Sequence, residues 1–467
     1  MNQDKTALLH LNDENITKES FIDSVQLQEP DMVAYTAFTH QFEFVKQSSS
    51  WLKESSYTKP IICGGVHTTV DPEDAINVPG IDMICIGEGE EALLELCERI
   101  RKGQDYHDVN NLWIKKGNEI IKNPVRPLLQ ELDKLPFLDK DIYDIRNIAD
   151  GTMGLLSTIA TRGCPFQCSY CCNHQYQRIY KGKGTYVRFR SPENVIEELE
   201  INKKKYPYLR YVELLDDTFL IKEEWVKEFC EKYKKRIAMP FRANAHVNFI
   251  NENVLTFLKN AGCERLALGI ESGNEKLRQD VLNRHMTNDR ILEAFRLCKK
   301  YEIEVISYNM VGIPFETLEN TLETIKLNAQ INPKSVHVSI CQPYPYTRLF
   351  DICKENNFIQ DKAVSTFFGN SVINQPSISK EETLLAYKYF APYVKIYSIL
   401  MSLPPVGGVL MKFLDYIYCK KNLHGFLMKI YPVSLFISCP ILSTYRIMLS
   451  HFPHFTRNLK RKFWKRY

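Results

Sequence analysis

The stretch TRGCPFQCSYCCNH, residues 161–174, places four cysteines within nine positions. Four kinds of site explain such a concentration of sulfur: a disulfide, a zinc site, a catalytic thiol and an iron–sulfur cluster. A lone catalytic thiol does not need two companion cysteines. The rest of the sequence decides among the other three.

The composition predicts an ordinary globular protein. The chain has 467 residues, of which 44% are hydrophobic and 25% are charged, which is enough for two or three domains. A net charge of +4 is too small to predict a nucleic-acid partner. The start, MNQDKTALLHLNDEN, has no basic region followed by an apolar run, so we expect a cytoplasmic protein with reduced thiols. The fourteen cysteines are then predicted to be metal ligands and core residues rather than disulfides.

The spacing of three of these cysteines favours a cluster. Cys164, Cys168 and Cys171 form C-x3-C-x2-C, which can hold three irons of a [4Fe–4S] cluster and leave the fourth iron open to another ligand. A Cys3His zinc site with His174 remains the alternative, although its final C-x2-H spacing is shorter than usual. We expect Cys172 to be a neighbour rather than a ligand, because consecutive side chains diverge.

The segment that contains these cysteines begins a regular alternation of strands and helices. Six buried apolar runs alternate with five amphipathic stretches, which predicts a parallel α/β barrel, or part of one, with about six βα units. The strands are expected at 154–161, 211–217, 241–247, 265–272, 305–312 and 335–343. The helices are expected at 192–205, 222–236, 251–261, 287–301 and 317–330.

The N-terminal part predicts a separate α/β unit. Apolar runs at 31–38, 60–66 and 82–89, a helix at 90–103 and a hairpin at 112–123 indicate a Rossmann-like parallel sheet. We expect this domain over residues 1–123, a linker over 124–152, the partial barrel over 153–350 and a mostly helical region over 351–467.

The C-terminal region leaves three interpretations open. Residues 426–449 are apolar over the length of a membrane span, but Pro432, Pro440 and Arg446 interrupt them. Residues 456–467 carry six Lys or Arg and no acidic residue. The region is therefore a helical subdomain packed on the barrel, a segment in peripheral contact with an anionic membrane, or a true span.

Polar and glycine-rich motifs follow the predicted barrel strands. They are the cysteine loop, LLDDTF, GIESGNEKL, MVGIPFET and CQPYPYT. In a parallel barrel the carboxyl ends of the strands lie on one rim, where such enzymes place their chemistry. The sequence therefore predicts one functional site around the cysteine loop.

Together these motifs resemble the radical S-adenosylmethionine (SAM) enzymes. In that family SAM chelates the open iron, an electron from the cluster breaks the sulfonium bond, and a 5′-deoxyadenosyl radical takes hydrogen from the substrate. The resemblance implies a [4Fe–4S] cluster on Cys164, Cys168 and Cys171. It also implies SAM contacts from Tyr170, Asp216, Asp217, Glu271, Ser272, Gly312, Ile313 and Pro314.

Residues 241–273 and 61–96 are similar to the radical SAM subset with an N-terminal cobalamin-binding domain. This resemblance implies cobalamin contacts from Thr39, Gly64, Gly65, Thr68 and Glu88. Three features depart from the pattern: only about 30 residues precede the first strand, no D-x-H-x-x-G is present, and His246 stands where arginine is usual. A domain that no longer binds cobalamin therefore stays an alternative.

The resemblance implies cobalamin-dependent methyl transfer to unactivated carbon, with no catalytic side chain assigned. The alternatives are a cobalamin-independent radical oxidation, cyclisation or rearrangement and, from another class, a zinc-held scaffold or membrane adaptor. The expected partners are a small-molecule or lipid-like substrate, an electron donor such as flavodoxin or ferredoxin, and a membrane surface at the C-terminus.

Overall fold

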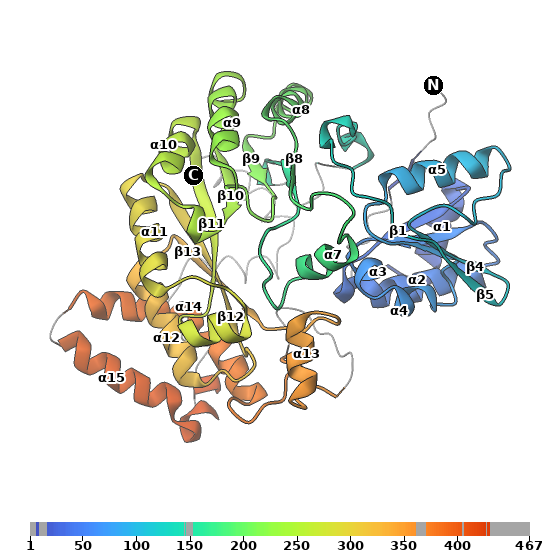
Figure 1. Cartoon of the computed structure of the whole chain (residues 1–467). Coiled ribbons are helices and arrows are strands. Elements are labelled where there is room, and N and C mark those ends of the chain that lie inside the picture. The colour runs from blue at the N-terminus through green and yellow to red at the C-terminus, as the bar shows by residue number, and fades with distance from the viewer. Residues whose placement is uncertain are drawn as a thin grey trace.

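The computed structural model of the chain describes residues 6–8, 16–143, 145, 153–360, 370–403, 406–425 and 427–429. Two large sheets and a helical C-terminal region follow one another along the described chain (Figure 1). Almost all of the interrupted apolar segment and the whole basic tail lie outside the described residues. No helix in the described part of the chain is long and apolar enough to cross a membrane.

The N-terminal sheet has the order β1-β2-β3-β4-β5. The first three strands are parallel, and the last two form the predicted antiparallel hairpin. This confirms the predicted parallel sheet. The strands are β1 (Val33–Thr36), β2 (Ile61–Gly64), β3 (Met83–Cys85), β4 (Leu112–Lys116) and β5 (Glu119–Lys122).

Five helices accompany this sheet. Of these, α5 was expected, while the others were not; in α2 a polar run, residues 46–50, separates Val45 from Trp51. Phe21 and Val25 of α1 pack with Leu52 of α2 and Ile61 of β2, which fixes α1 against the sheet. The helices are α1 (Lys18–Gln28), α2 (Phe42–Glu54), α3 (Val66–Val70), α4 (Pro72–Ile76) and α5 (Glu90–Arg101).

The central sheet has six parallel strands in the order β13-β12-β11-β10-β9-β6. The edge strands β6 and β13 do not pair, so the barrel is open, and helices cover its outer face (Figure 1). All six predicted strands are present: β6 (Leu155–Thr158), β9 (Tyr211–Leu214), β10 (Phe241–Ala245), β11 (Cys263–Glu271), β12 (Glu304–Val311) and β13 (Ser335–Ile340).

The five predicted barrel helices are confirmed as well. Their N-termini carry the capping side chains that the sequence offers: Ser191, Asn251, Thr287 and Thr317 each accept a bond from the backbone of the first turn. The helices are α8 (Pro192–Lys205), α9 (Glu223–Arg236), α10 (Glu252–Ala261), α11 (Asn288–Lys300) and α12 (Leu318–Ile331).

Several short elements that surround the site were not predicted. Among them are a two-stranded sheet of β7 (Thr161–Arg162) and β8 (Arg188–Phe189), helix α7 (Asn173–Ile179) and a π-helical turn (Leu277–Val281). The C-terminal region is helical, as expected, with α13 (Arg348–Glu355), α14 (Lys380–Met401) and α15 (Val406–Cys419).

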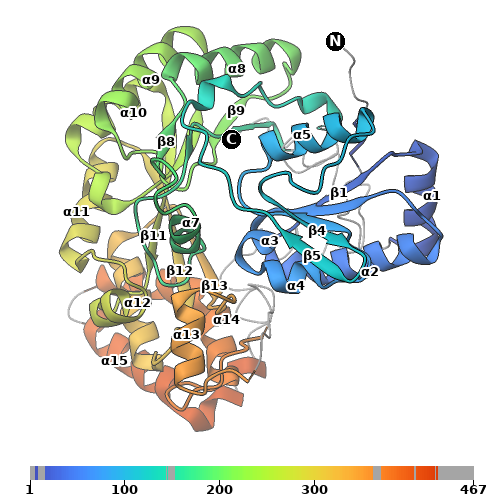
Figure 2. The same cartoon turned by 45° about the vertical axis from the view of Figure 1, so that its right-hand side comes forward.

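Helix α7 lies at the contact between the barrel and the N-terminal domain. It follows the cysteine loop of the barrel and contacts α3 of the N-terminal domain, and Figures 1 and 2 show it on the side of the barrel that faces this domain. A second connection lies nearby, where the hydroxyl of Tyr346, after β13, donates to Asp71 over 2.9 Å. The rim of the barrel therefore faces the carboxyl ends of β1, β2 and β3.

Candidate active site

The cysteine loop runs from β7 to α7 and carries the three predicted cluster ligands. Cys168 is buried, and Cys164 and Cys171 are half-buried. Burial raises the pKa of Cys164 to about 12, and the neighbouring charges of Cys171 and Cys168 act in the same direction. Two nitrogen donors face the sulfurs: Arg284 Nη1 lies 3.5 Å from Cys168 Sγ, and Asn173 Nδ2 lies 3.5 Å from Cys171 Sγ. Three neighbouring thiols with such donors suit an iron–sulfur cluster.

The side chains of the loop do not converge on a single point. Among the described residues, no three His, Cys, Asp or Glu side chains converge where they could hold one metal ion. Zinc needs its donors about 2.0–2.3 Å from a single centre. A cubane presents its irons at separate corners, so its thiolates do not have to meet at one point. The donor set therefore fits a cluster better than a zinc ion.

Cys172 lies closer to Cys171 than the sequence argument implied. A hydrogen bond from Cys172 lowers the pKa of Cys171 below that of an ordinary thiol. Consecutive side chains point in opposite directions on an extended backbone, but Cys172 has helical dihedral angles (φ −69°, ψ −16°) at the start of α7. This turn leaves both thiols on one side of the loop.

A buried polar network lies directly beside the loop. The hydroxyl of Tyr170 donates to Glu271 Oε1 over 3.1 Å, and Arg284 Nη1 lies 3.2 Å from the same hydroxyl. Arg284 Nη2 donates to the carbonyl of Gly269 over 2.7 Å, while its buried Nε has no partner among the described residues. Burial raises the pKa of Glu271, and the charge of Arg284 opposes this shift. The network thus retains one free donor for a further acidic group.

Glu271 sits on strained backbone at the end of β11. Its φ of +66° lies in the left-handed region, and the pairing of β11 with β12 shifts register between Gly269 and Glu271. Non-glycine residues in this region cost about 1–3 kcal/mol and are frequent at functional sites. The adjacent Ser272 is buried, and its hydroxyl accepts from the backbone of Asn274 over 3.2 Å, so it shapes the loop.

Sequence reasoning missed Arg284. It follows the π-helical turn after the GIESG motif and is only 9% exposed. One signal was available, since Arg284 lies between the apolar residues Leu282 and Met286, and a charge buried there needs a partner.

The two aspartates of LLDDTF have different surroundings. Asp216 is buried and accepts bonds from the backbone of Ala160 and Thr161 and from the Thr161 hydroxyl, the last over 2.6 Å. Burial raises its pKa to about 6. Asp217 is exposed and accepts from Asn173 Nδ2 over 3.1 Å. Asp216 therefore anchors the chain that leads into the cysteine loop, and Asp217 faces open space.

The MVGIPFET segment forms a closed turn after β12. Glu316 Oε2 accepts from the backbone of Gly312 over 2.5 Å and of Ile313 over 3.2 Å. Gly312 has a φ of +76°, and a side chain there would collide with Thr383 of α14. Ile313 and Pro314 are buried beneath the rim, where they support the turn.

His246, the departure from the family pattern, packs against the cysteine loop. Its ring stacks on Phe166 with centroids 4.0 Å apart, and its Nδ1 accepts from the backbone of Asn248 over 3.2 Å. Burial lowers its pKa to about 3, and Arg284 and Arg290 act in the same direction. His246 is therefore a neutral ring that supports the loop between Cys164 and Cys168.

Most of the residues that were predicted to contact cobalamin make contacts within the N-terminal domain itself. The hydroxyl of Thr68 is buried and donates to Cys85 O over 2.9 Å. Gly65 has a φ of +99°, and a Cβ there would lie 2.8 Å from the backbone of Ala37. Gly64 ends β2, and Thr39 is half-buried after β1. The glycines therefore permit close backbone packing in this structure.

A tyrosine from the barrel fills the remaining crevice. Tyr180, at the end of α7, is buried, and its hydroxyl accepts from the backbone of Glu88 over 2.7 Å. It occupies the space over Gly87, where a Cβ would overlap its hydroxyl. The crevice at the carboxyl ends of β2 and β3 is thus closed from the barrel side.

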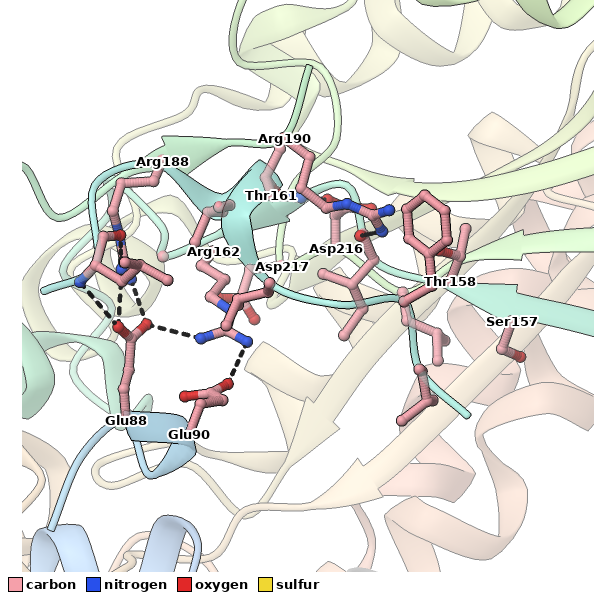
Figure 3. Close-up of a pocket in the computed structure, with 18 of the residues that line it drawn as sticks. Glu88, Glu90, Ser157, Thr158, Thr161, Arg162, Arg188, Arg190, Asp216 and Asp217 are labelled. Carbon is pink, nitrogen blue, oxygen red and sulfur yellow. Dashed lines mark hydrogen bonds and ion pairs between the residues drawn. The ribbon is translucent and has the colours of Figure 1, made fainter. Parts of the chain in front are cut away.

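Glu88 forms an ion-pair cluster between the domains (Figure 3). Its carboxylate binds Arg188 in a bidentate manner over 2.7 and 2.9 Å and Arg162 over 3.1 Å, and Arg162 also pairs with Glu90. Burial acts to raise the pKa of Glu88, but the bonds and charges of Arg188 and Arg162 outweigh it and lower the pKa. Glu88 therefore clamps the N-terminal domain to the barrel.

A cavity of about 1280 Å³ lies between the two domains. Phe38 and Val66, which follow β1 and β2, line its N-terminal side together with Leu94 of α5. Cys172 and Asp217 line the barrel side, and Figure 3 shows Asp217 beside the ion-pair cluster. The volume suits a corrin-sized group, and the carboxyl edge of a parallel sheet is the usual place for such ligands. The cavity therefore fits cobalamin, although the glycine crevice that would take its nucleotide tail is filled.

A second set of polar residues lines the inner face of the barrel. Tyr308 of β12 is 40% exposed and contacts the ring of His337 on β13, with centroids 5.4 Å apart. Arg242 of β10 pairs with Glu213 of β9 on the same face. Burial lowers the pKa of His337, and the charge of Arg242 acts in the same direction. These residues are not in the predicted motifs, because they lie within strands rather than at their ends.

Two family models match the chain in series. The B12 binding domain model matches residues 5–97, and the radical SAM superfamily model matches residues 158–327. An uncharacterized methyltransferase of Pyrococcus horikoshii is 28% identical, with 74% of each chain covered. An anaerobic magnesium-protoporphyrin IX monomethyl ester cyclase of Rubrivivax gelatinosus is 27% identical over 72% of this chain, which spans 60% of the cyclase.

A solved structure shares the fold over nearly the whole chain. It is the cobalamin-dependent S-adenosylmethionine radical enzyme OxsB with aqua-cobalamin and S-adenosylmethionine bound, with a TM-score of 0.67 and 16% identity. It covers 97% of this chain and 77% of its own. The B12 binding domain model covers the sheet next to the cavity, and the radical SAM model covers most of the barrel with its cysteine loop. The chain therefore carries a B12-binding domain in front of a radical SAM domain, and it is an enzyme.

Proposed function

We propose that the chain is a cobalamin-dependent methyltransferase that acts on unactivated carbon. The cavity between the domains is the observation that supports this proposal, because the B12-binding domain and the cysteine loop both border it. The name of the Pyrococcus relative supports methyl transfer as the reaction class. When bound, the cluster and SAM supply radical formation, and cobalamin supplies a methyl carrier.

The side chains around the loop have separate roles in this proposal. Cys164, Cys168 and Cys171 hold the cluster. Arg284, whose Nε is free, binds the SAM carboxylate, and Glu271 with Tyr170 keeps the guanidinium in place. Because the network is buried, each charged bond acts in a medium of low dielectric constant and is worth more than in water.

The remaining predicted SAM residues shape the pocket. Asp216 positions the loop, and Gly312, Ile313 and Pro314 form the floor that Glu316 closes. Asp217 faces the cavity near the cluster. Ser272 is a loop residue rather than a ligand contact in this proposal.

The proposed substrate has an apolar body and several polar groups. Leu138, Ile159 and Leu215 line the cavity and are each about half exposed (52%, 48% and 46%). Tyr308 and His337 offer hydrogen bonds deeper in the barrel. A small-molecule or lipid-like substrate meets both conditions. A low-potential donor such as flavodoxin or ferredoxin supplies the electron, which places the reaction in the cytoplasm.

One observation favours a second function. Tyr180 fills the crevice next to Gly87, where the nucleotide tail of cobalamin would lie. A cobalamin-independent oxidation, cyclisation or rearrangement accounts for this closure. The Rubrivivax relative, which is matched over less of its own length than the Pyrococcus methyltransferase, carries the name of a cyclase.

Anaerobic turnover with SAM labelled in its methyl group tests the proposal. The expected result is a corrin absorption band after reconstitution, 5′-deoxyadenosine on reduction, and label in a product. Formation of 5′-deoxyadenosine by protein that retains no corrin would establish the second function. Protein that holds iron and sulfide but leaves SAM intact would overturn both.

A further inference from the structure

Helix α15 exposes apolar side chains where a surface helix normally exposes polar ones. Val409 is 71% exposed, Phe413 59%, Tyr416 56% and Leu410 43%. At 3.6 residues per turn, positions 409, 413 and 416 form one stripe along the helix. The opposite face, with Met411, Leu414 and Tyr418, packs on α12 and α14. The outward stripe is therefore separate from the face through which α15 packs on the rest of the fold.

The stripe extends beyond α15. Ile399, in the last turn of α14, is 53% exposed, and Leu403, in the connection between the helices, is 51% exposed. A Cβ at Gly407 would overlap the carbonyl of Leu400, so the glycine allows α15 to begin close against α14. Large exposed apolar residues therefore gather on two adjacent helices, which marks an interaction surface.

The charge around this surface has one sign. The described part of residues 401–429 contains four lysines, Lys412, Lys420, Lys421 and Lys429, but a single acidic residue, Asp415, although the whole chain has 60 basic and 56 acidic residues. Asp415 is engaged by Lys326 over 2.7 Å and by the hydroxyl of Tyr397 over 2.5 Å. Lys412 and Lys420 lie on the same helical side as the stripe and are exposed. Exposed lysines therefore flank the apolar stripe.

We propose that the stripe of α15 binds peripherally to an anionic lipid bilayer. Apolar side chains enter the boundary between headgroups and acyl chains, and the lysines reach the lipid phosphates. A polynucleotide would meet the lysines but would leave the apolar stripe in water. The surface also lies at the end of the barrel away from the N-terminal domain and the cavity (Figures 1 and 2), so binding leaves the proposed active site accessible.

Vesicle sedimentation of the full chain tests the proposal. The wild type is expected to sediment with vesicles of phosphatidylcholine and phosphatidylglycerol, to bind phosphatidylcholine alone weakly, and to dissociate in high salt. The double variant Val409→Ser with Phe413→Ser should lower the partition coefficient about tenfold, since it removes two apolar side chains from the contact. The matched control, Leu27→Ser with Ile201→Ser, changes two residues that are 81% and 52% exposed elsewhere, and it should bind as the wild type does.

The alternative occupants of the stripe give different results. In a Phe413→Trp variant, the fluorescence difference from wild type should report a solvent-exposed indole that shifts to the blue when anionic vesicles are added. An indole that is already shielded in the free monomer would show that the chain itself covers the stripe. A dimer that the double serine variant dissociates would identify a second copy. Either outcome, or equal sedimentation of wild type and double variant, overturns the proposal.

Discussion

The rim of the barrel and the sheet edge of the N-terminal domain face the same cavity but differ in their polar groups. At the rim, Arg284 is buried with a free Nε, and Glu271 is held on strained backbone. At the sheet edge, Thr68 is fully bonded within its own domain, and Tyr180 fills the space over Gly87. The barrel site is therefore formed in advance, whereas the crevice for a nucleotide tail opens only if α7 moves.

The strongest test of the preformed site is the removal of a cluster ligand. Replacing Cys164, Cys168 or Cys171 by alanine should abolish cluster assembly, because two thiolates do not hold a cubane with one open corner. Iron and sulfide content and the visible absorption of anaerobically purified protein measure this loss. Cys172→Ala is the matched control and should keep its cluster. A Cys171 variant that retains iron while the Cys172 variant loses it would reverse the assignment.

The next test concerns the arginine beside the cluster. Arg284→Met should lower the rate of SAM cleavage about a hundredfold, since a charged hydrogen bond in a buried site is worth about 1.5–3 kcal/mol. Iron content should stay near that of the wild type, which separates cofactor binding from cluster assembly. Arg296→Lys, on an exposed part of α11, is the control and should cleave SAM normally. An unchanged KM for SAM in Arg284→Met would remove this residue from the cofactor site.

A substitution in the ion-pair clamp between the two regions is expected to have the next largest effect. Glu88→Gln leaves the buried Arg188 without its counter-charge, and breaking such a pair costs about 3 kcal/mol. Urea unfolding and proteolysis of residues 124–143 should both show a loosened N-terminal domain. Glu90→Gln, at a side chain that is 43% exposed, should cost less than about 1 kcal/mol. Equal stability of the two variants would contradict the clamp.

The clamp also has a predicted pH dependence. Since the folded protein lowers the pKa of Glu88 below its ordinary value of 4.5, its contribution is complete above that value. The contribution is lost as the pH falls through the lowered pKa. The difference in unfolding midpoint between wild type and Glu88→Gln should therefore shrink in acid.

The smallest expected effect is at Tyr180. If cobalamin places its tail in the crevice, the closed form reduces its apparent affinity, and Tyr180→Ala should tighten binding about tenfold. Corrin absorbance in a titration measures the affinity. Tyr301→Ala, on the far side of the barrel, should bind as the wild type does. Unchanged affinity in Tyr180→Ala would show that the crevice takes no part in binding.

The two regions also differ in how far the sequence predicted them. The barrel strands follow from short apolar runs, and α8 follows from its Ser191–Pro192 start, because these signals are local. The network at Arg284 and the clamp at Glu88 join residues 114 and 100 positions apart in the chain. No local pattern encodes such pairs. The filled crevice over Gly87 was not predicted for the same reason, because Tyr180, which fills it, belongs to another domain.

Part of the cavity wall comes from neither domain. Leu135, Phe137 and Leu138 line it from the segment between the two sheets, and they belong to no helix or strand. In the described chain these three residues belong to no strand pair, whereas their neighbours Asp133 and Asp141 bond to Ser191 and Lys205 at the two ends of α8. A lineage of such enzymes can therefore acquire a new substrate by altering this strip, while the scaffold that handles radicals is inherited intact.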